Sequence, residues 1–246
     1  MEMIAAGFLS ILLVAPTAPP QGEVDARPFR EPNHIIFAVS RIRAEQSWDG
    51  LLYTDPTGRY ALVSYGSGCL VSKDGHILTA NHVVTGGELY LVGGWPGTSA
   101  MVPAAIVKRD EAHDLAVVRV APPVAQFSYL TLDFVDTTNL AEGMDVFMWG
   151  CLSVPGAFMQ FLRKGSISNL AFLPGSEPVL FIESSAGQGT SGSPAFLRGG
   201  QPIGVVSTSI RLPGGGALPA GVLGIVPGQR VNELLLAAKV RTRASP

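Results

Sequence analysis

The sequence predicts an all-β protein made of two antiparallel six-stranded β-barrels, with one helix toward its C-terminal end. Glycine and proline are abundant, at 29 and 19 of the 246 residues, and they follow no fixed period. Short apolar runs alternate with these turn-forming residues along most of the chain, a pattern typical of short strands. The runs form two sets, on either side of the breaker Ala121-Pro122-Pro123. Roughly twelve short strands in two sets favour two small barrels over a single sandwich.

The first set of strands lies before this proline pair. The turn Lys73-Asp74-Gly75 joins two of its runs into a hairpin. We expect strands at residues 35–43, 60–72, 76–80, 88–92, 102–109 and 115–120.

The second set follows, and a helix ends it. Leu234, Leu235 and Ala238 recur at helical spacing, which predicts a helix at residues 231–239. We expect the strands of this set at residues 145–150, 158–170, 179–183, 193–197, 202–209 and 222–226.

Residues 3–15 form an apolar run that only Gly7 and Ser10 interrupt. The run is shorter than the roughly 20 residues that span a bilayer, and it fits the apolar region of a secretory signal peptide. We therefore expect export to the periplasm or the exterior, although no Lys or Arg precedes Arg27. The expected organisation is a signal peptide at 1–18, a linker at 19–33, an N-terminal barrel at 34–122, and a C-terminal barrel with the terminal helix at 123–246.

The composition excludes several classes of protein. Hydrophobic residues make up 47% and charged residues 15%, which favours a globular chain over a disordered one. The net charge of −2 excludes a mainly electrostatic nucleic-acid binder. Two cysteines, Cys69 and Cys151, exclude a disulfide scaffold and an all-cysteine metal site, and we expect no metal and no cofactor. Cys69 is predicted in the core, with a Cys69–Cys151 disulfide as the alternative in an exported protein.

Four histidines limit the catalytic triads that this chain can form, because none lies beyond His113. The α/β-hydrolase order of serine, acid and histidine fails for any nucleophilic serine in the C-terminal half. The subtilisin order of aspartate, histidine and serine belongs to a parallel α/β fold, which the strand-and-turn pattern does not support. The order histidine, aspartate, serine stays open.

Three residues fit that order. Ser191 lies in the glycine-rich segment 187–194 (GQGTSGSP), where a tight backbone turn can aim the N–H groups of Gly189 and Ser191 at an oxyanion. His82 follows an apolar run as a candidate base, and Asp114 precedes another as its partner. The structural alternatives are a glycine-rich hairpin loop, a core histidine and a turn aspartate, with Asp110 as a second candidate acid.

In this order, the three candidates resemble the triad of the chymotrypsin-fold serine proteases, most closely the HtrA/DegP-like branch of the trypsin-like peptidases. The resemblance covers residues from about 60 to 231. Thr190 and Ser193 stand where the family has Asn and a second Gly, and we expect no PDZ domain after the helix. The segments that resemble family motifs are 66–84 (GSGCLVSKDGHILTANHVV), 114–118 (DLAVV), 165–168 (GSIS) and 189–194 (GTSGSP).

The resemblance implies a role for each matching residue. His82 would be the general base, Asp114 would orient it, and Ser191 would be the nucleophile. The oxyanion hole would be formed by Gly189, Thr190 and Ser191. Substrate-binding positions would be Ser185, Val205, Val206, Ser207, Thr208 and Gly224, with Ser207 also bonding Asp114.

The sequence therefore predicts a serine endopeptidase that acts through an acyl-enzyme. Ser185 at the expected pocket floor carries no charge, which disfavours Lys or Arg substrates and favours small or medium aliphatic residues. The alternatives are an inactive module that binds peptides by strand addition, a narrow-specificity processing protease, and an esterase-like hydrolase. The expected partner is a protein or peptide substrate, with no nucleic acid and no stable membrane span; the oligomeric state does not follow from the sequence.

Overall fold

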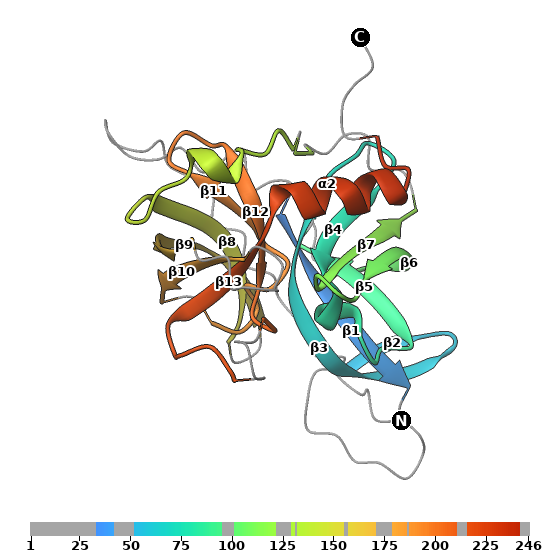
Figure 1. Ribbon diagram of the computed structural model, residues 1–246. Helices are drawn as coiled ribbons and strands as arrows, with labels where there is room; N and C mark the ends of the chain where they lie inside the picture. Colours follow the sequence, from blue (N-terminus) through green and yellow to red (C-terminus); the bar gives the residue numbers. More distant parts are fainter. Residues whose placement is uncertain are drawn as a thin grey trace, which may run out of the picture.

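Two six-stranded antiparallel barrels lie side by side in the computed structural model, and the helix α2 (Gly228–Ala237) runs from their junction over the first barrel (Figure 1). The structure describes residues 33–41, 52–94, 101–121, 129–130, 132–154, 157–170, 179–185, 187–210 and 216–241. The predicted fold class is confirmed. The predicted signal peptide and nearly all of the predicted linker lie outside the described residues.

The first barrel closes because β1 pairs with both β5 and β3. A further strand, β2 (Leu52–Asp55), pairs with the first residues of β3 as a hairpin. Around the barrel the order is β1 (Asn33–Arg41), β5 (Leu89–Gly93), β6 (Val102–Asp110), β7 (Leu115–Val120), β4 (His76–Ala80) and β3 (Gly58–Leu70).

The second barrel is closed through six antiparallel pairings. In order around it are β10 (Leu180–Ser184), β13 (Val222–Pro227), β12 (Pro202–Ser207), β11 (Pro194–Leu197), β8 (Asp145–Val154) and β9 (Ala157–Asn169). Because β12 lies between β11 and β13, its backbone is paired on both sides.

Each barrel has its own apolar core, and two further clusters join the barrels, the larger of which includes α2. This larger cluster combines Cys69 and Leu115 of the first barrel with Phe196 of the second and with Leu234 and Leu235 of α2. Burying a Leu side chain of this kind contributes roughly 1.5–3 kcal/mol. The helix therefore fixes the two barrels against each other, which matters because the candidate site lies between them.

The predicted strands correspond closely to the observed ones, and β4 and β7 have the predicted bounds. Three short elements were not predicted: β2, and the 3₁₀ helices η1 (Asn81–Val84) and η2 (Thr137–Asn139). The helix begins at Gly228, before the predicted start at residue 231. The prediction missed this start because proline and glycine, here Pro227 and Gly228, have the lowest helix propensities. Within the described ranges, no helix has the length and apolarity needed to cross a membrane.

Candidate active site

Asp114 binds His82 at two points. Nδ1 of His82 is 2.7 Å from Oδ2 of Asp114, and the His82 backbone N–H donates to Oδ1 at 2.8 Å. The pairing of β4 with β7 brings this about, since Ala80 lies opposite Leu115 and the Asn81 N–H donates to the Asp114 carbonyl at 3.0 Å. A proton on Nδ1 leaves Nε2 as the proton acceptor. None of the described residues hydrogen-bonds Nε2, and the side chain is 30% exposed.

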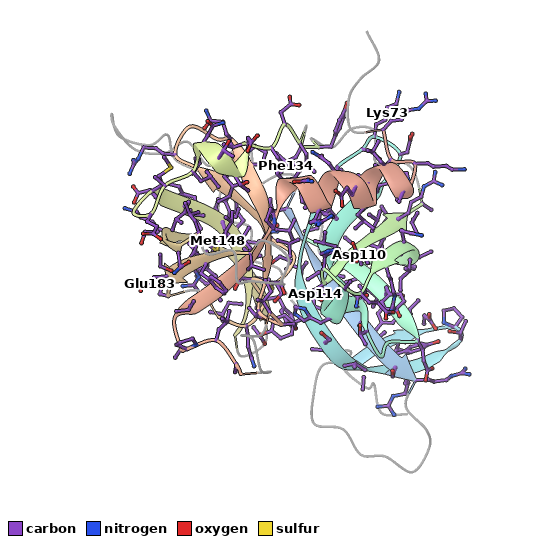
Figure 2. All side chains as sticks on the ribbon, viewed as in Figure 1. Lys73, Asp110, Asp114, Phe134, Met148 and Glu183 are labelled. Carbon is purple, nitrogen blue, oxygen red and sulfur yellow. The ribbon has the colours of Figure 1, made fainter. Side chains whose placement is uncertain are left out.

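Asp114 lies where the two barrels meet (Figure 2). Its φ of +55° is in the left-handed region, which Asp tolerates better than most residues. Its Oδ2 atom also accepts a hydrogen bond from the hydroxyl of Ser207, at the end of β12. One carboxylate thus ties the histidine of the first barrel to a strand of the second, and the predicted Ser207–Asp114 contact is present.

Ser191 lies in the second of two consecutive tight turns. The Thr190 N–H donates to the Gly187 carbonyl at 3.3 Å, and the Ser193 N–H donates to the Thr190 carbonyl at 3.0 Å. Gly189 and Gly192, third in each turn, have φ values of +87° and +88°, the type II pattern. A Cβ on Gly189 would lie 2.0 Å from the Cys151 carbonyl oxygen. Both the conformation and the packing therefore require glycine there.

The backbone N–H groups of Gly189 and Ser191 have no acceptor among the described residues. The Thr190 N–H is already used by Gly187, and the Thr190 hydroxyl bonds the same carbonyl. Of the three predicted oxyanion-hole residues, two thus have an N–H available for a substrate and the third supports the turn.

Ser67 anchors this loop to the first barrel. Its N–H donates to the Ser191 carbonyl at 2.8 Å, and its hydroxyl donates to the Gly189 carbonyl at 2.7 Å while accepting from the Cys151 N–H at 3.0 Å. Sequence reasoning did not single out Ser67. The available signal was a serine between Gly66 and Gly68 in an otherwise apolar strand end.

The Ser191 hydroxyl is bound by Thr208. The two hydroxyl oxygens are 2.7 Å apart, and the Thr208 N–H also donates to Oγ of Ser191 at 3.3 Å. No hydrogen bond joins Ser191 to His82, and Ser191 is 3% exposed. The structure therefore brings the three predicted residues into one region and links two of them directly.

The predicted substrate-binding residues differ in what they can offer. Val205 and Val206 are buried, and both backbones are paired on each side, so they support their neighbours and leave no group for a substrate. Ser185 is exposed. Gly224 faces Ile210, since a Cβ there would lie 2.3 Å from Cδ1 of Ile210.

The other candidates from the sequence lie outside this network. Asp110 pairs with His113, with 2.7 Å between Oδ2 and Nδ1, and so does not hold His82. Cys69 is in the core as predicted, and both cysteines are free thiols, so the alternative disulfide is absent. Burial raises the pKa of both thiols. Within the described part of the chain, no three His, Cys, Asp or Glu side chains gather as a metal site.

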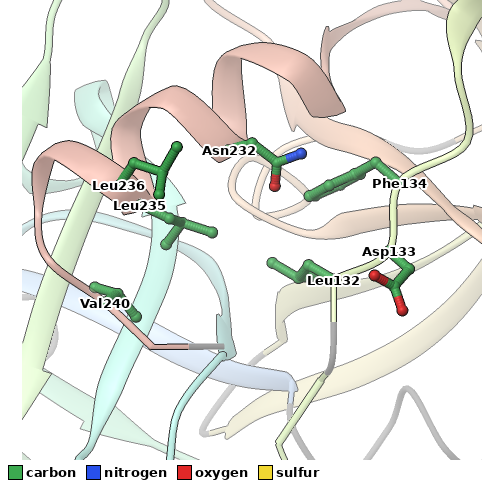
Figure 3. A pocket seen from close by; sticks show the side chains of 7 residues that line it. All are labelled: Leu132, Asp133, Phe134, Asn232, Leu235, Leu236 and Val240. Carbon is green, nitrogen blue, oxygen red and sulfur yellow. The ribbon is translucent and has the colours of Figure 1, made fainter. Parts of the chain in front are cut away.

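A hollow of about 420 Å³ lies away from these residues, beside α2 (Figure 3). It is lined by Leu235 and Leu236 of the helix and by Leu132 and Phe134 of the preceding segment. None of its lining residues belongs to the His82–Asp114–Ser191 region.

Two barrels with a histidine–aspartate pair and a serine turn at their junction define the chymotrypsin-like class of protein. The family model "Trypsin-like peptidase domain" matches residues 66–205. This chain belongs to that family, the trypsin-like peptidases.

Relatives in sequence include a periplasmic serine endoprotease, DegP-like, from Brucella suis, 30% identical over 176 residues, covering 70% of this chain and 32% of the relative. A DegP-like protein from Rhizobium meliloti is 32% identical over 174 residues, covering 67% and 33%. The magnetosome formation protease MamE of Magnetospirillum gryphiswaldense is 30% identical over 195 residues, covering 76% and 24%. The chain spans about a third of the length of the DegP-like relatives.

Solved structures agree with the fold. A serine endoprotease from Yersinia pestis has a TM-score of 0.61 at 19% identity, covering 87% of this chain and 64% of its own. The HtrA-type protease AlgW with a tripeptide has a TM-score of 0.63 at 19% identity, covering 86% and 61%.

Proposed function

We propose that this protein is an endopeptidase that cleaves peptide bonds with Ser191 as nucleophile, His82 as general base and Asp114 as the residue that orients His82. The observation that carries the proposal is the two-point contact between Asp114 and His82, which fixes the ring with Nε2 available. A plain core histidine would have both ring nitrogens satisfied within the fold.

In the proposed reaction, Oγ of Ser191 attacks the substrate carbonyl carbon while Nε2 of His82 takes the hydroxyl proton. The N–H groups of Gly189 and Ser191 bind the oxyanion, an effect worth about 3–4 kcal/mol per donor in comparable sites. The C–N bond then breaks and the amine leaves with the proton from His82. Water attacks the acyl-enzyme through the same base and releases the second product.

Substrates with a small or medium aliphatic side chain fit the proposed pocket best. Ser185 brings no charge to bind Lys or Arg. The Ile210 side chain lies in the segment that follows β12 and covers Gly224 of β13. It thereby narrows the space between that segment and β13. Ser207 and Thr208, where the pairing of β12 ends, complete the proposed pocket wall.

Export belongs to the same proposal. The apolar run at residues 3–15 has the character of a signal peptide, and the DegP-like relatives are described as periplasmic. Cell fractionation and N-terminal sequencing of the mature protein test it. Recovery of the intact chain from the cytoplasm alone would contradict it.

One observation favours a second candidate, a module that binds peptides without cleaving them. The nucleophile is hydrogen-bonded to Thr208 and not to His82, as a permanently inactive relative would allow.

Digestion of an unfolded protein such as reduced casein separates the two. The proposal predicts new termini, found by mass spectrometry, mostly after Ala, Val, Ile or Leu. Ser191→Ala should abolish them, whereas Thr138→Val, which removes an exposed hydroxyl bonded only to Asp136, should not. Peptide binding without new termini would favour the binding module.

A further inference from the structure

Thr208 engages the candidate nucleophile through its hydroxyl and its backbone N–H. Its hydroxyl oxygen is 2.7 Å from Oγ of Ser191, and its N–H donates to the same atom at 3.3 Å. No other hydrogen bond of the Ser191 hydroxyl lies within the described residues. The position of the Ser191 oxygen is therefore set by Thr208.

Thr208 directly follows the last residue of a paired strand. Ser207, the residue before it, is buried, pairs with Gly224 of β13, and donates its hydroxyl to Asp114. Two consecutive residues at the end of β12 thus contact two different members of the proposed triad. Rotation of the Ser191 side chain, and not movement of the strand, is the simplest way to break the Thr208 contact.

Attack on a carbonyl needs a different arrangement. The Ser191 proton must pass to Nε2 of His82, within hydrogen-bond reach of about 2.6–3.2 Å. Because Nε2 has no partner among the described residues, the acceptor is ready while the hydroxyl is held elsewhere. A competing hydrogen bond of ordinary strength lowers the population of the attack-ready arrangement.

We propose that Thr208 is a positioning residue that holds the Ser191 hydroxyl in a resting arrangement away from His82, so that its own hydroxyl sets the fraction of attack-ready enzyme. The inference rests on the proposed function, in which Ser191 is the nucleophile. It also assigns the Ser191–Thr208 contact to a reversible resting state and not to permanent inactivity.

The first test is the rate at which a small fluorophosphonate labels Ser191. Thr208→Val keeps the β-branched shape and removes the hydroxyl, and should label about three- to tenfold faster than the wild type, which at 1.4 kcal/mol per decade is about 0.7–1.4 kcal/mol, the usual range for one hydrogen bond. Thr208→Ser restores the hydroxyl and should return the rate toward the wild-type value. Thr138→Val is the remote control.

Equal or slower labelling of a folded Thr208→Val protein overturns the inference, with folding checked by thermal unfolding. In that case, labelling of the wild type that disappears in Ser191→Ala would still support the proposed function. The two failures are thus distinguishable.

A second test needs no turnover. Ring ¹⁵N chemical shifts of His82 report what its Nε2 atom contacts. The inference predicts that Ser191→Ala leaves these shifts unchanged in the wild-type background, because no hydrogen bond joins the two side chains. The same substitution should change them when Thr208 is Val, since the freed hydroxyl reaches Nε2. A shift change in the wild-type background, or none in either, overturns the inference.

Discussion

His34 provides a quantitative test of how the first barrel is packed. It lies on β1, opposite Gly68 of β3, and its side chain is completely buried. Burial lowers the pKa of His34 from 6.5 to about 3, with the Gly93 backbone as a smaller opposing effect. The imidazole is therefore neutral in the folded protein over the whole working range of pH.

The sign of the effect on stability follows from the two pKa values. Below pH 6.5 the unfolded chain binds a proton at His34, whereas the folded chain binds this proton only below about pH 3. The contribution of neutral His34 to the free energy of unfolding is complete above pH 6.5 and is lost as the pH falls toward 3. Each pH unit within this window costs about 1.4 kcal/mol. The free energy of unfolding should thus drop by about 2 kcal/mol between pH 8 and pH 5 because of this residue.

Urea unfolding at pH 8, 6.5 and 5, followed by tryptophan fluorescence, measures the effect. His34→Gln removes the titrating group. Between pH 8 and pH 5, the free energy of unfolding of this variant should therefore fall by about 2 kcal/mol less than that of the wild type, whatever the variant's stability at pH 8. Other groups, including His76, whose pKa burial also lowers, are present in both proteins and cancel. An identical pH dependence in the two proteins would refute the reasoning.

Three further predictions concern the site and the helix. Asp114→Asn should lower kcat about 10⁴-fold in a peptidase assay, by analogy with the same change in a chymotrypsin-like triad, and a loss below tenfold would argue against its role. Gly192→Ala should lower the unfolding free energy by at least about 1–2 kcal/mol, because φ is +88° and a Cβ would lie 2.0 Å from the Ser67 carbonyl oxygen; wild-type urea stability would contradict this. Leu235→Ala should cost about 2–5 kcal/mol, whereas Leu236→Ala, at a position 76% exposed, should cost under about 0.5 kcal/mol; equal melting temperatures for the two would refute the packing of α2.

Local patterns predicted most of the fold. Runs such as β4 and β7 are apolar and bounded by turns, so that the spacing of apolar residues and the flanking turn residues define them without tertiary information. The strand β2 escaped prediction because Leu52–Asp55 is short and half polar, and it exists only through its pairing with β3. The 3₁₀ helix η1 escaped because its residues read as the continuation of an apolar strand.

The site divides in the same way. His82, Asp114 and Ser191 lie in motifs that a sequence reveals by type and order. Ser67 acts through contacts with Gly189 and Ser191, which are 122 and 124 positions away in the sequence. The Thr208 hydroxyl acts on Ser191, which is 17 positions away. Those contacts depend on how the barrels meet and how the serine turn closes. A reading of local pattern has no access to either.

The most direct measurement of the central claim is labelling of the purified protein with a fluorophosphonate, followed by intact-mass spectrometry. An activated serine and a working oxyanion site predict one adduct per chain on the wild type. Ser191→Ala should carry none, and Thr138→Val should carry one. A folded wild-type protein that takes up no adduct, or an adduct that persists in Ser191→Ala, would contradict the assignment of Ser191 as the nucleophile.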